Sequence, residues 1–126
     1  MRLEELEEMM TEEPAQAEAA IAELAAAGHV DQLAQIAKSA RVQDLQLEAI
    51  EQLGKIGSAE ASAALVEMLE AVKAPLAIGG TEQRMDRAAV QARLVRALAR
   101  ARGTNPPAVR SQRDIEEFIE SIRNAP

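Results

Sequence analysis

The stretch Leu47–Val72 constrains the fold most, because its spacing indicates two short helices that fold back on each other. Gly57 in its middle has no Cβ and can take the left-handed conformation that closes a helix, while Ser58 can cap the helix that follows. Each helix is too short to be stable alone in water, so we expect the pair to pack against neighbours. The apolar stripes that support this are Leu47, Ile50, Leu53 and Ile56 before the turn, and Leu65, Met68, Leu69 and Val72 after it.

The same pattern recurs upstream, at a constant offset of 29 positions. Downstream the match is looser: the offset grows to 44, and the segment 74–81 absorbs the extra length. Repetition with a period of roughly 30 to 45 residues predicts a helical solenoid, a short right-handed stack of antiparallel helix pairs. The aligned positions are Ala20 with Ala49, Ile21 with Ile50, Leu24 with Leu53 and Gly28 with Gly57 upstream, and Leu94 with Ile50, Ala97 with Leu53 and Ala101 with Gly57 downstream.

The central pair consists of an Ala- and Leu-rich helix that ends in Leu-Gly-x-Ile-Gly, a short turn, and a helix of the form Ala-x-x-x-Leu. The residues that carry this pattern are Gly54, Ile56, Gly57, Ala61, Leu65 and Leu69. On these residues the stretch resembles a HEAT-type repeat, in the short bacterial form of the family that includes phycobilisome bilin lyases. The resemblance covers 45–72 and extends more loosely to 15–40 and 84–102. It implies an α-helical scaffold, and a scaffold alone does not fix a function.

We expect one all-α domain over residues 1–126 with about seven helices, because no β-branched run alternates with polar residues as in a strand. A plain bundle of six or seven helices, with an incidental repeat, is the alternative. Pro14 is expected to start a helix, and Pro106 with Pro107 to end one, because proline fits only the first helical turn. The expected parts are an N-terminal capping helix at 1–10, HEAT-like helical repeats at 14–40, 45–73 and 82–102, and a C-terminal capping helix at 111–124.

Each expected helix has an apolar face that would point into the core. Asp44 is the expected N-cap of the central pair, and Ser111 or Asp114 would open the last helix. The remaining residues expected to point inward are Ala17, Ala20, Ile21 and Leu24; Val30, Leu33, Ile36 and Ala37; Val90, Leu94, Ala97, Leu98 and Ala101; and Ile115, Phe118, Ile119 and Ile122.

The first helix, Arg2–Met10, has apolar residues on one side and glutamates around the rest. It fits a solvated cap over the open end of the first repeat, an arm that docks on another protomer or a partner, or a frayed tail. The apolar residues are Leu3, Leu6 and Met9 or Met10, and the glutamates are Glu4, Glu5, Glu7 and Glu8.

The net charge of −7 is unevenly distributed along the chain. Residues 1–73 contain 15 acidic and 5 basic side chains, whereas residues 74–126 contain 6 and 9. An acidic body with a basic C-terminal third is the feature of the composition that bears on partner choice. The chain has no cysteine, which excludes disulfides and thiolate metal sites. Its acidic N-terminus has no long apolar run, so we expect a cytoplasmic protein with neither a signal peptide nor a membrane span.

No group of residues has the spacing of a catalytic centre, so we expect neither an enzyme nor a bound cofactor or metal. His29 is the only histidine and falls at a turn, and without cysteine it cannot assemble a zinc site. Ile78, Gly79 and Gly80 belong to a glycine-containing loop, but a phosphate-binding loop needs a lysine that this one does not have. The loop interrupts the repeat spacing, so it is either a flexible connection or a contact loop for a partner.

Arg93, Arg96 and Arg100 fall within about 60° of one another around a helix, opposite its apolar side. They are candidates for binding an acidic protein surface, because a guanidinium group can bind a carboxylate through two hydrogen bonds. An ordinary solvated face and a nucleic-acid site are the alternatives. The negative net charge disfavours nucleic acid, as does the lack of an aromatic platform, since Phe118 is the only aromatic residue.

The leading hypothesis is therefore a non-catalytic adaptor, a small α-solenoid that presents one surface to a protein partner. Self-association is a natural extension, because the acidic first helix of one copy could meet the arginines of another. The alternative, which rests on the family resemblance, is an accessory or lyase-type factor that acts on a bilin-carrying antenna protein. The visible absorbance of the chain mixed with free bilin would distinguish the two.

Overall fold

The structure, a computed structural model, describes residues 3–40, 42–73, 81–109 and 111–124, with the side chains of all of these except 72, 73, 81–88 and 112. The described residues form seven α-helices and no strand, which confirms the prediction of an all-α chain. In order along the chain the helices are α1 (Leu3–Glu12), α2 (Pro14–Ala26), α3 (Val30–Ser39), α4 (Gln43–Ile56), α5 (Ala59–Lys73), α6 (Thr81–Ala101) and α7 (Gln112–Arg123).

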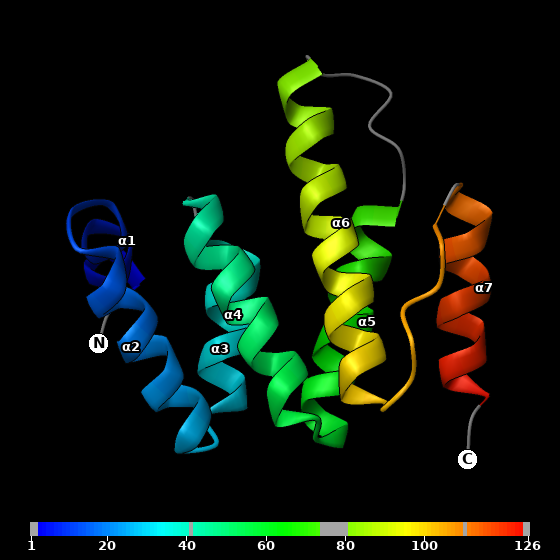
Figure 1. Cartoon of the computed structure of the whole chain (residues 1–126), viewed down its shortest axis with the longest axis horizontal. Coiled ribbons are helices and arrows are strands. Elements are labelled where there is room, and N and C mark those ends of the chain that lie inside the picture. The colour runs from blue at the N-terminus through cyan, green and yellow to red at the C-terminus, as the bar shows by residue number, and fades with distance from the viewer. Residues whose placement is uncertain (1–2, 41, 74–80, 110, 125–126) are drawn as a thin grey trace.

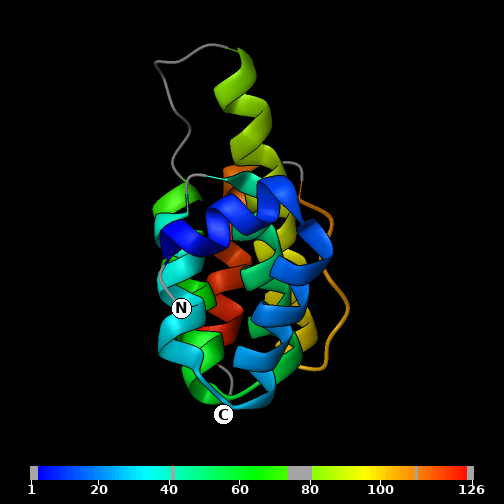
Figure 2. The same ribbon diagram turned by 90° about the vertical axis from the view of Figure 1, so that its left-hand side faces the viewer.

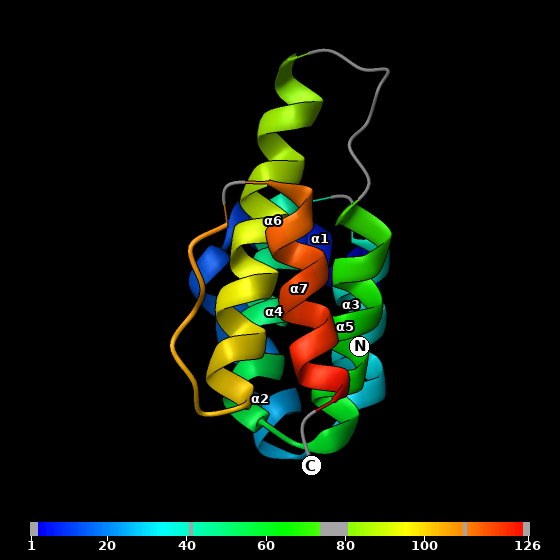
Figure 3. The ribbon, with the colours of Figure 1, turned by 90° about the vertical axis from the view of Figure 1, so that its right-hand side faces the viewer.

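The helices between the two ends of the chain lie in two rows along the long axis of the molecule (Figures 1 and 2). Helices α2, α4 and α6 form one row and α3 and α5 the other, so the chain alternates between the rows. Helix α4 contacts α2, α3, α5 and α6 and is therefore the centre of the packing. Helix α1 lies against α2 at one end of the rows, and α7 lies against α5 at the opposite end (Figure 3).

The three helices of the first row end in the same way. Gly57 follows α4 with φ +65°, and its N–H donates to the carbonyl of Leu53 at 3.3 Å, which confirms the predicted left-handed closure. Gly28 and Gly103 take the same conformation after α2 and α6. The downstream alignment is thus off by two residues at this point, because α6 continues through Ala101 and closes at Gly103.

Serine side chains cap two helices. The Ser58 hydroxyl accepts a hydrogen bond from the backbone N–H of Ala61 at 3.1 Å, as predicted. Of the two residues proposed to open the last helix, Ser111 is the N-cap, and its hydroxyl accepts from the backbone N–H of Asp114. The prediction that Asp44 caps α4 is wrong, because the helix begins at Gln43 and its N-cap position is Val42, two residues earlier. Asp44 lies in its first turn, where the helix dipole favours a carboxylate.

The core follows the predicted apolar faces, but five residues expected to point inward are only half-buried and pack against the core from its edge: Ala20, Leu24, Ala101, Phe118 and Ile122. The side chain of Val72 lies outside the described residues. In α4 the predicted stripe needs a correction as well. Leu47 and Ile56 are only half-buried, because a spacing of three residues falls about 60° short of a full helical turn and the ends of the stripe drift from the core. Leu45 and Ala49 are fully buried there instead. The residues whose predicted burial is confirmed are Leu6, Met10, Ala17, Ile21, Val30, Leu33, Ile36, Ala37, Ile50, Leu53, Leu65, Met68, Leu69, Val90, Leu94, Ala97, Leu98, Ile115 and Ile119.

Helices α4 and α6 approach each other closely because small residues face each other. A Cβ placed on Gly54 would lie 2.9 Å from the Cα, Cβ and O atoms of Ala97, which is closer than real contacts allow. One turn further, a Cβ on Gly57 would meet the carbonyl oxygen of Ala101 at 3.5 Å. This approach fixes which side chains of α4 and α6 meet at the surface.

Candidate interaction surface

Helix α6 presents the arginines because its other sides are buried. Leu94 and Leu98 are fully buried and Val90 is nearly so, which leaves the opposite side of the helix at the surface. Val95 and Ala99 are buried as well, which the sequence analysis missed. The reason is that α6 is contacted by both α4 and α5, so its buried arc is wider than a single stripe. The carbonyl of Ala99 also accepts from the backbone N–H of Thr104 at 2.8 Å in the segment after the helix.

Arg93 turns toward α4 and is held within the molecule. Its Nη1 donates to Oε2 of Glu51 at 2.9 Å, and about two-thirds of each side chain is buried, with exposed fractions of 32% and 37%. The charge of Arg93 is therefore compensated inside the chain. Of the three arginines proposed from the sequence, Arg93 joins α4 to α6. Its guanidinium group is already paired with Glu51, so it has fewer donors left for a partner.

Arg96 and Arg100 form the exposed part of the predicted stripe. They lie one helical turn apart on α6, and both side chains are exposed. Within the described part of the chain, neither forms an ion pair with another residue. Two neighbouring guanidinium groups with free donors can each bind a carboxylate through paired hydrogen bonds.

At the level of Arg93, one turn before Arg96 and two turns before Arg100, α4 carries acidic side chains, and the exposed Lys55 follows one turn later. On α4, Glu48 and Glu51 are half-buried, and Glu48 Oε1 accepts from Nε2 of Gln52 at 3.1 Å. Glu51 is neutralised by Arg93, so a carboxylate-bearing partner at this surface meets mainly the guanidinium groups of Arg96 and Arg100.

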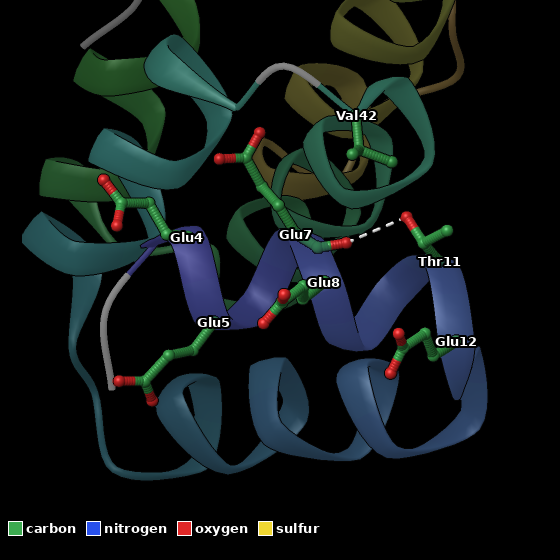
Figure 4. A pocket seen from close by; sticks show the side chains of 7 residues that line it. All are labelled: Glu4, Glu5, Glu7, Glu8, Thr11, Glu12 and Val42. Atoms are coloured by element: carbon green, nitrogen blue, oxygen red, sulfur yellow. Dashed lines mark hydrogen bonds between the residues drawn. The ribbon is translucent and has the colours of Figure 1, made fainter.

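The glutamates of α1 line an open surface depression of about 580 Å³ beside the start of α4 (Figure 4). Their carboxylates point in different directions around the helix, and the Thr11 hydroxyl donates to the backbone carbonyl of Glu7 at 3.1 Å. Among the described residues no three His, Cys, Asp or Glu side chains are placed to hold a metal ion together. The depression therefore has the character of a solvated face. Its lining residues are Glu4, Glu5, Glu7, Glu8, Thr11, Glu12 and Val42.

Three of the residues proposed for partner binding, Ile78, Gly79 and Gly80, lie outside the described residues. His29 is exposed at the N-cap position of α3, at the turn where the sequence placed it. In the described part of the chain, every buried side-chain nitrogen or oxygen has a hydrogen-bond partner. The helices described by the structure include none that is long and apolar enough to cross a membrane.

No protein-family model, curated protein or solved structure matches this chain. The likeness to HEAT-type repeats therefore depends on the residues of the chain itself, among them Gly54, Gly57 and Leu65.

Proposed function

We propose that the chain is a cytoplasmic, non-catalytic protein-interaction module: a short right-handed α-solenoid of HEAT-like helix pairs that binds an acidic partner protein. The alternation of the chain between two rows of helices supports the solenoid. So does the repeated glycine closure at Gly28, Gly57 and Gly103, since equivalent turns at equivalent places are typical of structural repeats.

The observation that carries the proposed binding site is the division of the arginine stripe. Arg93 is committed to Glu51, whereas Arg96 and Arg100 face solvent on a rigid helix whose other sides are buried. Arginines held by a rigid helix lose less conformational freedom on binding than arginines on a loop, so more of their hydrogen-bond energy is kept as affinity.

An acidic protein fits this surface better than a nucleic acid does. The chain has a net charge of −7 and an acidic cluster on α1. The exposed part of the arginine stripe consists of two arginines on one helix, which is too short to follow a continuous phosphate backbone. A protein can place a carboxylate against Arg96 and Arg100 and present other groups to α4. Self-association belongs to the same proposal, because the chain has acidic surface of its own on α1.

The test is an affinity capture from native lysate with wild type beside Arg96→Glu/Arg100→Glu, at low and high salt. Arg93 is left unchanged, because its replacement would break the contact with Glu51 and confuse folding with binding. The matched control is Lys38→Glu/Arg113→Glu, which makes the same change in net charge at exposed residues of surface ion pairs on α3 and α7, away from the site.

We expect a partner that wild type and the control capture and the Arg96/Arg100 variant loses, with capture weakened as salt screens the charges over about 10 Å at 0.1 M. If the captured protein is the chain itself, the module self-associates. A partner held equally by all three proteins would contradict the proposed site.

A further inference from the structure

Helix α7 is attached to the rest of the molecule through a narrow surface. Among the described helices, only α5 contacts it extensively. Ile115 and Ile119 are buried, whereas Phe118 and Ile122 are only half-buried. Arg123, at the end of α7, forms an ion pair with Glu70 on α5.

The segment that leads to α7 is exposed over Gly103–Val109. It runs back along α6 before α7 begins, so α7 points in the same direction as α6 and opposite to α5 (Figures 1 and 3). Pro106 and Pro107 have a fixed φ and no backbone N–H, which keeps this segment extended and without helical structure. The connection between α6 and α7 therefore contains no helix or strand over residues 103–109.

We propose that α7 is exchanged between two copies of this chain, so that the α7 of each copy docks on the α5 of the other. The inference goes beyond the proposed function, because it gives self-association a contact between α5 and α7 that does not involve Arg96 or Arg100. The exchange requires no additional binding surface. In the dimer, α7 of one copy forms with α5 of the other copy the same contact that it forms with its own α5 in the monomer.

The contact that is exchanged is a ridge of three side chains four residues apart: Ile115, Ile119 and Arg123. On α5, Val66 lies one turn before Glu70 and on the same face, and both are half-buried. The ridge thus combines two buried aliphatic groups with a guanidinium, and the strip of α5 combines a half-buried valine with the carboxylate that pairs with that guanidinium. A second copy of α7 has the complement of this strip by construction, which is why the proposal names the chain itself as the occupant.

Linker length decides between the closed and the exchanged form. A short tether gives α7 an effective concentration of about 1 mM at its own α5, so the closed form dominates when the protein is dilute. The closed form requires the linker to return along the length of α7, which is about 18 Å for 12 residues at 1.5 Å each. Deleting residues 104–110 leaves Arg102, Gly103 and Ser111 between α6 and α7, and three residues span at most about 11 Å. In that variant α7 cannot reach its own α5 in the observed direction, but it can reach a second copy.

The first experiment measures the mass of the 104–110 deletion variant by light scattering and native mass spectrometry, beside the full-length chain. We expect the deletion to double the mass while the helical content by circular dichroism stays that of wild type. A shortened chain that remains a monomer overturns the exchange, whether or not another protein then covers α5. Open-ended oligomers in place of a dimer overturn the reciprocal form proposed here.

The second experiment identifies the exchanged contact by mixing two charge variants of the shortened chain, Glu70→Arg and Arg123→Glu. Each homodimer pairs like charges at both contacts, whereas the heterodimer pairs opposite charges at both. We expect the ratio of heterodimers to homodimers to be about threefold or more above the one-to-one ratio of random mixing. The control mixes Glu60→Arg with Arg113→Glu, exposed residues away from the contact, and should assort at random.

If the shortened chain does not fold, the same mixing is done at high concentration with the linker intact, and random assortment there overturns the proposal. None of these variants alters Arg96 or Arg100. Failure of the exchange would therefore leave partner capture intact, and failure of the arginine site would leave the dimer intact.

Discussion

The contact between α4 and α6 and the contact between α5 and α7 are built on different principles. In the first, Gly54 lies against the backbone of Ala97, and Leu53 and Leu94 are fully buried within the core. In the second, two isoleucines are buried, their apolar neighbours on α7 remain half-exposed, and the connecting segment is exposed. The first contact depends on backbone fit and the second on a few side chains.

This difference predicts where the molecule opens. Removing α4 from α6 exposes the centre of the core and therefore amounts to global unfolding, because α4 contacts helices of both rows. Removing α7 exposes one strip of α5 and leaves both rows in place. Segments with few buried apolar contacts open locally, at free energies below that of global unfolding.

The largest expected effect is that of Leu94→Ala, at the centre of the first contact. Leu94 is fully buried, so the change should lower the free energy of unfolding by about 2–5 kcal/mol. Its counterpart is Ile115→Ala, in the second contact, for which we expect less than about 1 kcal/mol in the global transition because α7 has already separated by then. Chemical denaturation followed by circular dichroism measures both. Equal losses would mean that α7 unfolds together with the core.

Gly54→Ala tests the backbone fit directly. The new Cβ would meet the Cα and O atoms of Ala97 at 2.9 Å, and these cannot move without shifting α6. We expect a loss of about 1–3 kcal/mol, although alanine favours an isolated helix over glycine by roughly 1 kcal/mol. The double variant Gly54→Ala/Ala97→Gly should recover only part of the loss, because it removes the Cβ of Ala97 and leaves the backbone clash. Full recovery of stability would mean that the clash at Gly54 involves only the Cβ of Ala97 and not its backbone, which would contradict the proposed backbone fit.

A smaller effect is expected for the ion pair across the same contact. A double-mutant cycle with Glu51→Gln and Arg93→Gln should give a coupling of about 0.5–1 kcal/mol, since both side chains are partly exposed and screened by solvent. The same cycle on Arg113 and Glu117, an exposed pair within α7, should give a coupling near zero in the global transition. If the coupling between Glu51 and Arg93 is no larger than that between Arg113 and Glu117, the ion pair does not stabilise the contact between α4 and α6, and the proposed role of Arg93 is wrong.

The smallest effects compare the two serine caps. Ser58→Ala removes the acceptor for the N–H of Ala61 at the start of α5 and should cost about 0.5–1 kcal/mol of global stability. Ser111→Ala removes the equivalent acceptor of α7, so its cost should appear as faster local opening of that helix. Amide exchange by NMR separates local from global opening. A global loss from Ser111→Ala would contradict the independence of α7.

Local chemistry made much of the fold predictable from sequence. Gly57 and Ser58 marked the central turn because one has no Cβ and the other carries a capping hydroxyl, and both act as predicted. The face of α3 was predicted in full because its apolar spacing matches a helical period. The start of α4 was misplaced because aspartate is a good capping residue, but Asp44 lies two residues beyond the N-cap position, which Val42 occupies.

The site was less predictable, because it depends on which helices meet. The sequence placed Arg93, Arg96 and Arg100 on one face, and the structure separates Arg93 from the others through Glu51, 42 positions away in the chain. One signal was present: Glu51 precedes Gly54 by three residues, and Arg93 precedes Ala97 by four. Once two helices are known to be neighbours, small residues that face each other indicate a close contact between them. Opposite charges one turn before these small residues then indicate an ion pair across that contact.

Native-state hydrogen exchange tests most directly the claim that the molecule is a rigid two-row body with a separable last helix. Amide exchange free energies are measured residue by residue at low concentrations of denaturant. We predict that α7 exchanges at clearly lower free energy and with weaker denaturant dependence than α4 and α6, which should exchange through global unfolding. If α7 exchanges with the same free energy and the same denaturant dependence as α4, the molecule opens as one unit and the account is wrong.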